Sequence, residues 1–350
     1  MSVTIRDVAE RAGVSAASVS LVLNNKECRI SEETKRRIVE EANALGYSLK
    51  KTKKIGSGPS LGNVGNVIGV IFSESSDELI EECLGGIENY ASIYGYHVFR
   101  MFSSNQSRKC AEQIEIAAAM GAAGLIVIPP ADMNSDGNHI ILGERLKKTG
   151  IPYVLLDRAI QDVFCDFVTV DNKLGANMAI DYLMEAGHRK IGIIAGRKEV
   201  YNTRKRVEGY REGFILRGYE VDESMIWYGD YSARSGAMGA ECLLSAGATA
   251  LIACNAQMTA GVCEYAREQG LAIGGDFSLI SFANMRRTDG GYPDLTCIRQ
   301  PGEQMGRKAA EVLEGRMRGE DLGSVKTNYF MPSFQEGTSV KRLDRTVYDE

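Results

Sequence analysis

The residues of this chain best placed to do chemistry are polar side chains that directly follow expected buried strands, together with an arginine and a tyrosine from neighbouring segments. They supply a carboxylate, two guanidinium groups, amides, a hydroxyl and an aromatic ring: Ser73, Asp157, Arg158, Arg204, Tyr231, Asn255 and Gln257. This set suits the binding of a small hydroxylated or anionic ligand. Each residue alone is a weak signal, because an Asp-Arg pair at a strand end is as often a local salt bridge as a ligand clamp.

The sequence offers no set of residues for catalysis. The eight cysteines contain no C-x-x-C pair, the glycines at 56, 58 and 62 precede a strand rather than follow one, and no G-x-x-x-x-G-K-[ST] loop occurs. The three histidines are dispersed and suit structural roles: His97, His139 and His188. We therefore expect no catalytic residues, no metal and no cofactor.

Alternating strands and helices must position the polar residues. The chain reads as four strands with helical crossovers from residue 67 to 156, and the same alternation repeats from residue 167 to 282. Such alternation predicts parallel sheets covered on both faces, and thus two doubly wound lobes with a ligand cleft at the carboxyl ends of their strands. A helix from about 302 to 317 and a strand from 326 to 330 follow.

The start of the chain has a different pattern. The segment TIRDVAERAGVSAASVSLVLN begins at Thr4, and Thr4 and Ser15 can cap two short helices separated by Gly13. The second helix has a face of small or short side chains that can approach a DNA groove closely: Ala16, Ala17, Ser18, Ser20 and Leu21. A third helix, capped by Ser31, can close a small core. The pattern favours a helix-turn-helix unit over a plain helical hairpin.

Charge is distributed unevenly along the 350 residues. Residues 1–58 hold 11 Lys and Arg against 7 Asp and Glu, a net of +4, whereas the remainder holds 30 against 39, a net of −9. A basic head on an acidic body fits a protein whose head alone touches a polyanion. The start lacks a basic and apolar signal region, and no apolar run reaches the roughly 18 residues of a membrane span. We expect a cytoplasmic protein without a membrane partner.

Residues 3 to 47 resemble the headpiece of the lactose-repressor (LacI/GalR) family of bacterial transcription regulators, through DVAERAGVSAASVSLVLN and RISEETKRRIVEEANALGY. Further likeness to about residue 340 rests on GIPYVLLDR, VTVDNKLGANMAIDYLMEAGHRKIGIIAG, TRKRVEGYREGF and PDLTCIRQP. The resemblance implies an all-α helix-turn-helix headpiece followed by a two-lobed, periplasmic-binding-protein-like α/β domain. The implied parts are a headpiece at 1–48, a linker at 49–66, lobe 1 at about 67–162 plus 296–325, lobe 2 at about 163–295 plus 326–340, and a tail at 341–350.

A regulator of this kind binds double-stranded operator DNA as a homodimer, with a tetramer also open, and enters successive major grooves of a near-palindrome. The residues expected at base edges are Ala16, Ala17, Ser18 and Leu21. Those expected at phosphates or as braces are Ser15, Ser20, Asn24, Asn25, Arg29 and Tyr47, and Thr4 is assigned to the same DNA-binding set.

The resemblance also implies a small-molecule effector in the cleft. Ser73, Asp157, Arg204 and Asn255 fall where family members contact sugars, purines or similar effectors, and Phe167 and Tyr231 fall where aromatic rings wall the pocket. Two carboxylates of the family pattern are missing: Ala283 and Asn284 follow LISF, and Ala256 follows Asn255. This argues against a simple neutral hexose and leaves an altered or anionic effector, or none, open.

The linker departs from the family as well. After Tyr47 the sequence SLKKTKKIGSG lacks the Pro-Asn pair that usually opens a hinge helix in the family. Family members insert a leucine of that helix into the minor groove as a wedge, and here Gly56 falls at about that position, next to Ile55. This predicts weaker operator bending and more reliance on attraction between lysines and phosphates.

Three other functions remain as alternatives. In the first, the protein binds DNA in the same way but has a degenerate pocket, and its activity is controlled by a partner protein or by its own abundance. A solute-binding protein would fit the body alone but needs an export signal, and an α/β enzyme needs a catalytic set in the cleft.

Overall fold

Three short helices form the first unit of the structure, a computed structural model that describes residues 4–23, 30–45, 66–73, 78–283, 294–320 and 323–343. They are α1 (Ile5–Ala12), α2 (Ala16–Leu23) and α3 (Glu32–Ala44). The backbone N–H and the hydroxyl of Thr4 donate to the Asp7 carboxylate at 2.7 and 2.8 Å, which fixes the start of α1 and lowers the pKa of Asp7. Gly13 ends α1 at a φ of 65°, and Ser15 Oγ accepts the Ser18 N–H at 3.0 Å. The expected caps are therefore present.

The three helices close their own apolar core. Val8, Val19 and Ile38 come one from each helix and are fully buried. Ser31 caps α3 by accepting the Thr34 N–H at 3.3 Å. The small unit thus has the inner packing and helix caps that hold a helix-turn-helix together.

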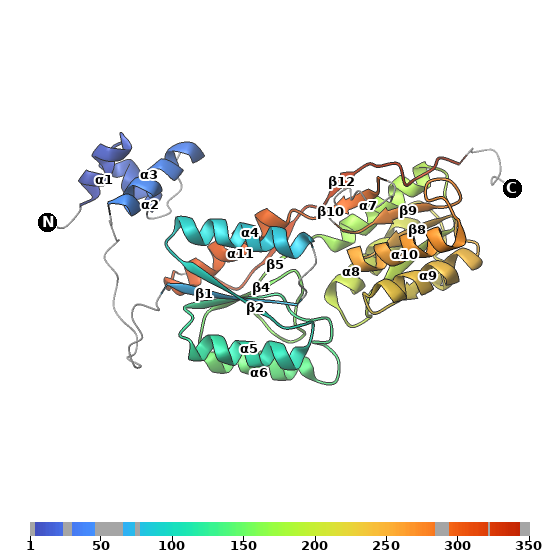
Figure 1. Cartoon of the computed structure of the whole chain (residues 1–350), viewed down its shortest axis with the longest axis horizontal. Coiled ribbons are helices and arrows are strands. Elements are labelled where there is room, and N and C mark those ends of the chain that lie inside the picture. The colour runs from blue at the N-terminus through green and yellow to red at the C-terminus, as the bar shows by residue number, and fades with distance from the viewer. Residues whose placement is uncertain are drawn as a thin grey trace.

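Two six-stranded sheets form the body (Figure 1). The first, all parallel, has the order β11-β5-β4-β3-β1-β2, with α4 and α11 on one face and α5 and α6 on the other. Its elements are β1 (Val67–Phe72), α4 (Glu78–Ile93), β2 (His97–Phe102), α5 (Ser107–Ala119), β3 (Gly124–Val127), α6 (Asn138–Thr149), β4 (Tyr153–Leu156), β5 (Asp166–Val170), α11 (Gly302–Met317) and β11 (Thr327–Phe330).

The second sheet has the order β12-β10-β9-β8-β6-β7, and only β12 runs antiparallel to its neighbour. Its elements are α7 (Asn172–Glu185), β6 (Ile191–Ala195), α8 (Tyr201–Ile215), a 3-10 turn (Glu223–Met225), β7 (Ile226–Tyr228), α9 (Ala233–Ser245), β8 (Ala250–Ala253), α10 (Ala256–Gln269), β9 (Ser278–Ser281), β10 (Thr296–Arg299) and β12 (Ser333–Gln335). The doubly wound fold class expected from the sequence is therefore present in both lobes.

The expected lobe boundaries are wrong for three strands. β5 and β11 belong to the first sheet, where β5 pairs with β4 and β11 pairs with β5. β10 belongs to the second sheet, where it pairs with β9 and β12. Each connection between the sheets therefore follows a completed strand, after β5, β10 and β11. The short strand β12 was not predicted, because three residues carry almost no periodic signal.

Residues 341–343, expected to begin a loose tail, are held against the second lobe. The Leu343 N–H donates to the Ala186 carbonyl at 2.7 Å, and Lys341 Nζ donates to the Gly275 carbonyl at 2.6 Å. The part of the expected tail from 344 to 350, like most of the linker at 49–66, lies outside the described residues.

Glycines let the helices that cover the sheets touch backbone to backbone. A Cβ at Gly86 of α4 would lie 2.0 Å from the Glu303 carbonyl oxygen of α11, and one at Gly306 would lie 2.0 Å from that of Cys83. Gly209 of α8 meets the carbonyl of Lys173 in the same way. No side chain larger than hydrogen fits at these crossings, so they fix the spacing of the helix pairs.

Gly86→Ala is expected to lower the free energy of unfolding by about 1–3 kcal/mol, because its methyl group must push α11 away. The adjacent Gly85 provides a matched control, since a Cβ there meets nothing within 4 Å. Gly85→Ala should be neutral or stabilising by up to about 1 kcal/mol through helix propensity. Urea unfolding of both variants measures the difference, and equal stabilities would contradict the close crossing.

His188 has the structural role expected of it. Its ring is fully buried, with Nδ1 2.9 Å from Thr249 Oγ1 and Nε2 2.8 Å from Ser278 Oγ and 3.2 Å from the Lys341 carbonyl oxygen. Burial lowers the pKa of His188 from 6.5 to about 4. The neutral ring therefore joins β9 to the chain around Lys341.

Stability should fall on acidification in a way that depends on His188. In the unfolded chain the His188 ring binds a proton at about pH 6.5, whereas in the folded chain it does so only near pH 4. The contribution of the neutral ring to the free energy of unfolding is therefore complete above pH 6.5 and is lost as the pH falls from 6.5 to 4. The full loss corresponds to about 3 kcal/mol. Unfolding free energies of the wild type and His188→Asn across this range isolate the effect, and parallel pH profiles would refute it.

Candidate functional site

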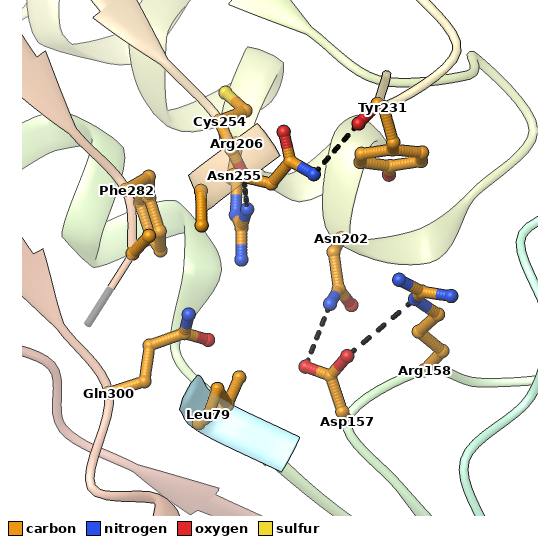
Figure 2. A pocket seen from close by; sticks show the side chains of 12 residues that line it. Leu79, Asp157, Arg158, Asn202, Arg206, Tyr231, Cys254, Asn255, Phe282 and Gln300 are labelled. Carbon is orange, nitrogen blue, oxygen red and sulfur yellow. Dashed lines mark hydrogen bonds and ion pairs between the residues drawn. The ribbon is translucent and has the colours of Figure 1, made fainter. Parts of the chain in front are cut away.

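A pocket lies between the two lobes, at the carboxyl ends of their strands (Figure 2). The empty space of the pocket, counted together with the part open to solvent, is about 400 Å³. Twelve residues line it: Leu79, Asp157, Arg158, Asn202, Arg206, Tyr231, Cys254, Asn255, Ala256, Phe282, Ala283 and Gln300. The parallel topology of the two sheets places these side chains together although they are far apart in the sequence.

Asp157 joins the two lobes at the floor of the pocket. It directly follows β4 and has a φ of 65°, a backbone conformation that is strained for a residue other than glycine. Its carboxylate accepts the Asn202 amide from α8 at 2.9 Å and lies 3.6 Å from Arg158 Nε. One carboxylate is thus shared between a guanidinium of its own lobe and an amide of the other lobe.

Arg158 is buried beside Asp157 and turned toward the first lobe. Its Nη1 donates to the Pro129 carbonyl at 3.2 Å and to Ser73 Oγ at 3.4 Å. The guanidinium carbon also lies 5.6 Å from the centre of the Tyr231 ring, close enough for a cation–π contact. These contacts fix the group at the edge of the pocket.

Arg206 enters the pocket from α8 of the second lobe. Its Nε donates to Asn172 Oδ1 at 2.7 Å, its Nη1 donates to the Cys254 carbonyl, and its guanidinium carbon lies 3.8 Å from the centre of the Phe282 ring. The side chain is 5% exposed. Among the described residues it has no carboxylate in ion-pair contact, so its charge is held by neutral partners alone.

Tyr231 and Asn255 form the wall of the second lobe. Tyr231 has a φ of 72°, its hydroxyl is 2.5 Å from Thr203 Oγ1, and its ring lies against Gly196, where a Cβ would come within 2.0 Å. Burial raises the pKa of Tyr231, and the positive charge of Arg158 opposes that rise. Asn255 caps α10 by accepting the Met258 N–H at 2.9 Å, and it donates to the Tyr231 carbonyl at 3.1 Å.

Four of the eight residues expected at the effector site line the pocket: Asp157, Arg158, Tyr231 and Asn255. Ser73 is fully buried behind Arg158. Phe167 meets Tyr201 edge-on at 5.5 Å between ring centres, outside the pocket lining. Gln257, the second residue of α10, is exposed on that helix and also lies outside the lining. These three positions correct the sequence expectation.

Arg204 is the clearest correction. It is exposed on α8, because it lies two positions before Arg206 and a step of two positions turns a helix by about 200°. The buried face of α8 contains Asn202, Arg206 and Tyr210, at spacings of four. This spacing was readable in the sequence and would have selected Arg206. Phe282 and Gln300, which the sequence analysis also missed, are brought in by β9 and by the connection after β10.

The expected DNA-contacting residues divide in a similar way. Ser15 and Ala17 are exposed at the start of α2, whereas Ala16 is half-buried and packs against the apolar core of the head. Ser18, Ser20 and Leu21 are half-buried, and Thr4 is exposed. Asn24, Asn25, Arg29 and Tyr47, like Asn284 after the second-lobe strand, lie outside the described residues.

Within the described ranges, no group of three or more His, Cys, Asp or Glu side chains could hold a metal ion. The same residues contain no helix with the length and apolar character needed to cross a bilayer.

Comparison with known proteins matches the headpiece and part of the body to known families. Residues 4–48 match the bacterial regulatory proteins of the lacI family, and residues 180–340 match the periplasmic binding protein-like domain. Catabolite control protein A of Priestia megaterium is 30% identical over 327 residues, covering 93% of this chain and 95% of that protein. The HTH-type transcriptional repressor PurR of Aliivibrio salmonicida is 28% identical over 320 residues, covering 90% and 92%.

Among solved structures, the transcription regulator CcpA of Lactococcus lactis superposes with a TM-score of 0.72 at 26% identity, over 79% of this chain and 99% of that one. The family of this chain follows from its headpiece, from its two-lobed body and from relatives that cover both. The chain belongs to the lacI family of bacterial regulatory proteins and is a DNA-binding helix-turn-helix transcriptional regulator, not an enzyme.

Proposed function

We propose that this regulator is a sequence-specific repressor, which binds a near-palindromic operator as a homodimer under the control of a small ligand in the cleft. The observation that carries the proposal is the combination, in one chain, of a helix-turn-helix unit and a pocket where buried polar side chains of two lobes converge. Pockets of this kind orient small polar molecules. A sugar, a sugar derivative or a nucleobase-like compound is the expected class of ligand.

The exposed side of α2 supports reading of a major groove. Ala17 is exposed there, and Ser15 stands at the amino end of the helix, where N–H groups favour a phosphate. Alanine and leucine can contact a thymine methyl group but cannot make the bidentate hydrogen bonds of Arg or Gln. We therefore assign base contacts to Ala17, Ser18 and Leu21, and phosphate contacts to Ser15 and Ser20.

Apolar side chains near the open edge of the first sheet support the dimer. β2 is the edge strand, and Phe102 at its end is 40% exposed. On the helix that follows, Ile116 and the adjoining Met120 are 45% and 54% exposed. Exposed apolar side chains on an edge strand and on the helix that follows it favour burial against a second copy.

Direct contacts between the lobes can couple ligand binding in the cleft to the position of the helix-turn-helix unit. Besides the bond from Asn202 to Asp157, Asn134 Nδ2 donates to the Glu199 carbonyl at 2.9 Å, and Arg299 donates to the Glu82 carboxylate of α4 at 3.2 Å. A ligand that favours one arrangement of these contacts shifts the population of lobe positions by its differential affinity. Because α4 belongs to the lobe that follows the head, the shift can change the spacing of two heads in a dimer.

The operator-binding role predicts a specific loss in Ala17→Glu, which turns a carboxylate toward the DNA. Operators are first selected with the full chain from a random DNA library, and the enriched fragments should contain an inverted repeat. Affinity of Ala17→Glu for such a fragment should fall about 100-fold or more. Ala246→Glu, at an exposed position of the second lobe, provides the matched control. If both variants bind like the wild type, α2 does not read the operator.

The proposed dimer edge predicts that Phe102→Asp shifts the protein toward monomer. A charge at an apolar contact must be desolvated on association, so the dimer dissociation constant should rise at least about tenfold. Phe164, which is 88% exposed on the loop after β4, allows the same substitution away from β2. Sedimentation velocity over a concentration series compares the two variants. A dimer that survives Phe102→Asp as well as Phe164→Asp would exclude this edge.

A further inference from the structure

The charged side chains that line the pocket do not balance. Asp157, Arg158 and Arg206 are the only ionised residues among the twelve lining residues, so the lining bears a net charge of +1. Asp157 and Arg158 neutralise each other at 3.6 Å. The excess positive charge is therefore that of Arg206.

The partners of Arg206 stabilise a cation without neutralising it. An amide oxygen, a backbone carbonyl and the face of Phe282 surround the guanidinium, and none of them carries a charge. A buried ion without a counterion is costly, and proteins normally pair such an ion or bind an opposite charge. A guanidinium also has five N–H donors in a fixed fork, so the two used here leave capacity for a planar or tetrahedral anion.

Asn202, which also lines the pocket, has a buried oxygen that needs a hydrogen-bond donor. Its side-chain NH₂ must face Asp157, because an ionised carboxylate only accepts hydrogen bonds. That orientation leaves Asn202 Oδ1 buried without a hydrogen-bond partner, in a residue that is 4% exposed. A buried acceptor of this kind needs a donor, which a hydroxyl group of a ligand can supply.

We propose that the ligand of this cleft is a small hydroxylated acid, with its carboxylate or phosphate on Arg206 and a hydroxyl group on Asn202. This rests on the proposed function, in which the cleft holds the controlling ligand. A neutral sugar of the same shape would supply the hydroxyl group but leave the charge of Arg206 uncompensated.

The test uses matched neutral and acidic compounds against the full-length protein. Thermal shift and calorimetry compare glucose with gluconate, glucuronate and glucose 6-phosphate, and ribose with ribose 5-phosphate, with inorganic phosphate and acetate as bare anions. A bound ligand raises the melting temperature by mass action. We expect an acidic compound to bind at least about 30-fold more tightly than its neutral partner, which corresponds to one charge-assisted pair. The sugar carboxylates and the sugar phosphates form separate arms that identify the anion.

Two substitutions on the same helix assign the effect to its residue. Arg206→Gln should abolish the preference for the acid, whereas Arg206→Lys, which keeps the charge, should retain part of it. Arg204→Gln removes the same charge from the exposed side of α8 and should behave like the wild type. Operator affinity and the melting temperature without ligand show whether each variant is folded.

The outcomes separate this inference from the function on which it rests. Binding of the acid, lost in Arg206→Gln and kept in Arg204→Gln, supports the assignment. Tighter binding of a neutral sugar, equal affinities within each pair, or silence of the whole panel overturns the inference while operator binding still supports a DNA-binding repressor. Failure of the wild type to select any DNA sequence would instead overturn the proposed function.

Discussion

The buried guanidinium of Arg206 ties the second lobe together at the point where it faces the first. It reaches from α8 to Asn172 at the start of α7, to the end of β8 through the Cys254 carbonyl, and to Phe282 after β9. A charge in this position costs solvation energy that apolar packing would not. The fold therefore places an ionic group where a uniform core would be more stable, which is typical of a binding site rather than of a structural element.

Close helix crossings make it possible for such a site to respond as a unit. α4 and α11 touch through Gly86 and Gly306 in the first lobe, and α8 meets α7 through Gly209 in the second. Helices at backbone contact cannot slide past each other without a clash, which opposes rearrangement within each lobe. Three connections and side-chain pairs such as Arg299 and Glu82 join the two lobes, so a change in the arrangement of the lobes has to involve these contacts.

Periodicity predicted the elements well, and it placed strand ends correctly enough to find Asp157, Arg158 and Asn255. It could not show that β5 belongs to the first sheet, because partner choice between strands depends on contacts distant in sequence. Arg204 was preferred to Arg206 both in the set of candidate polar residues and in the family pattern, although the helical spacing of Asn202, Arg206 and Tyr210 favours Arg206. Side-chain partners such as Phe282 and Gln300 arise only from the packed fold.

The arrangement around Asp157 shows how a modest ligand could control the lobes. The Asp157 carboxylate pairs with Arg158 within its lobe and accepts a hydrogen bond from Asn202 across the cleft, so the lobes already share a hydrogen bond to a charged group of the protein itself. A ligand need not create the whole interface. It has to supply only the free-energy difference between two arrangements of the lobes. A hydrogen bond to an ionised group supplies about 1.5–3 kcal/mol. That is comparable to a typical coupling energy between two sites of about 1–3 kcal/mol, so one anion held by Arg206 would be enough.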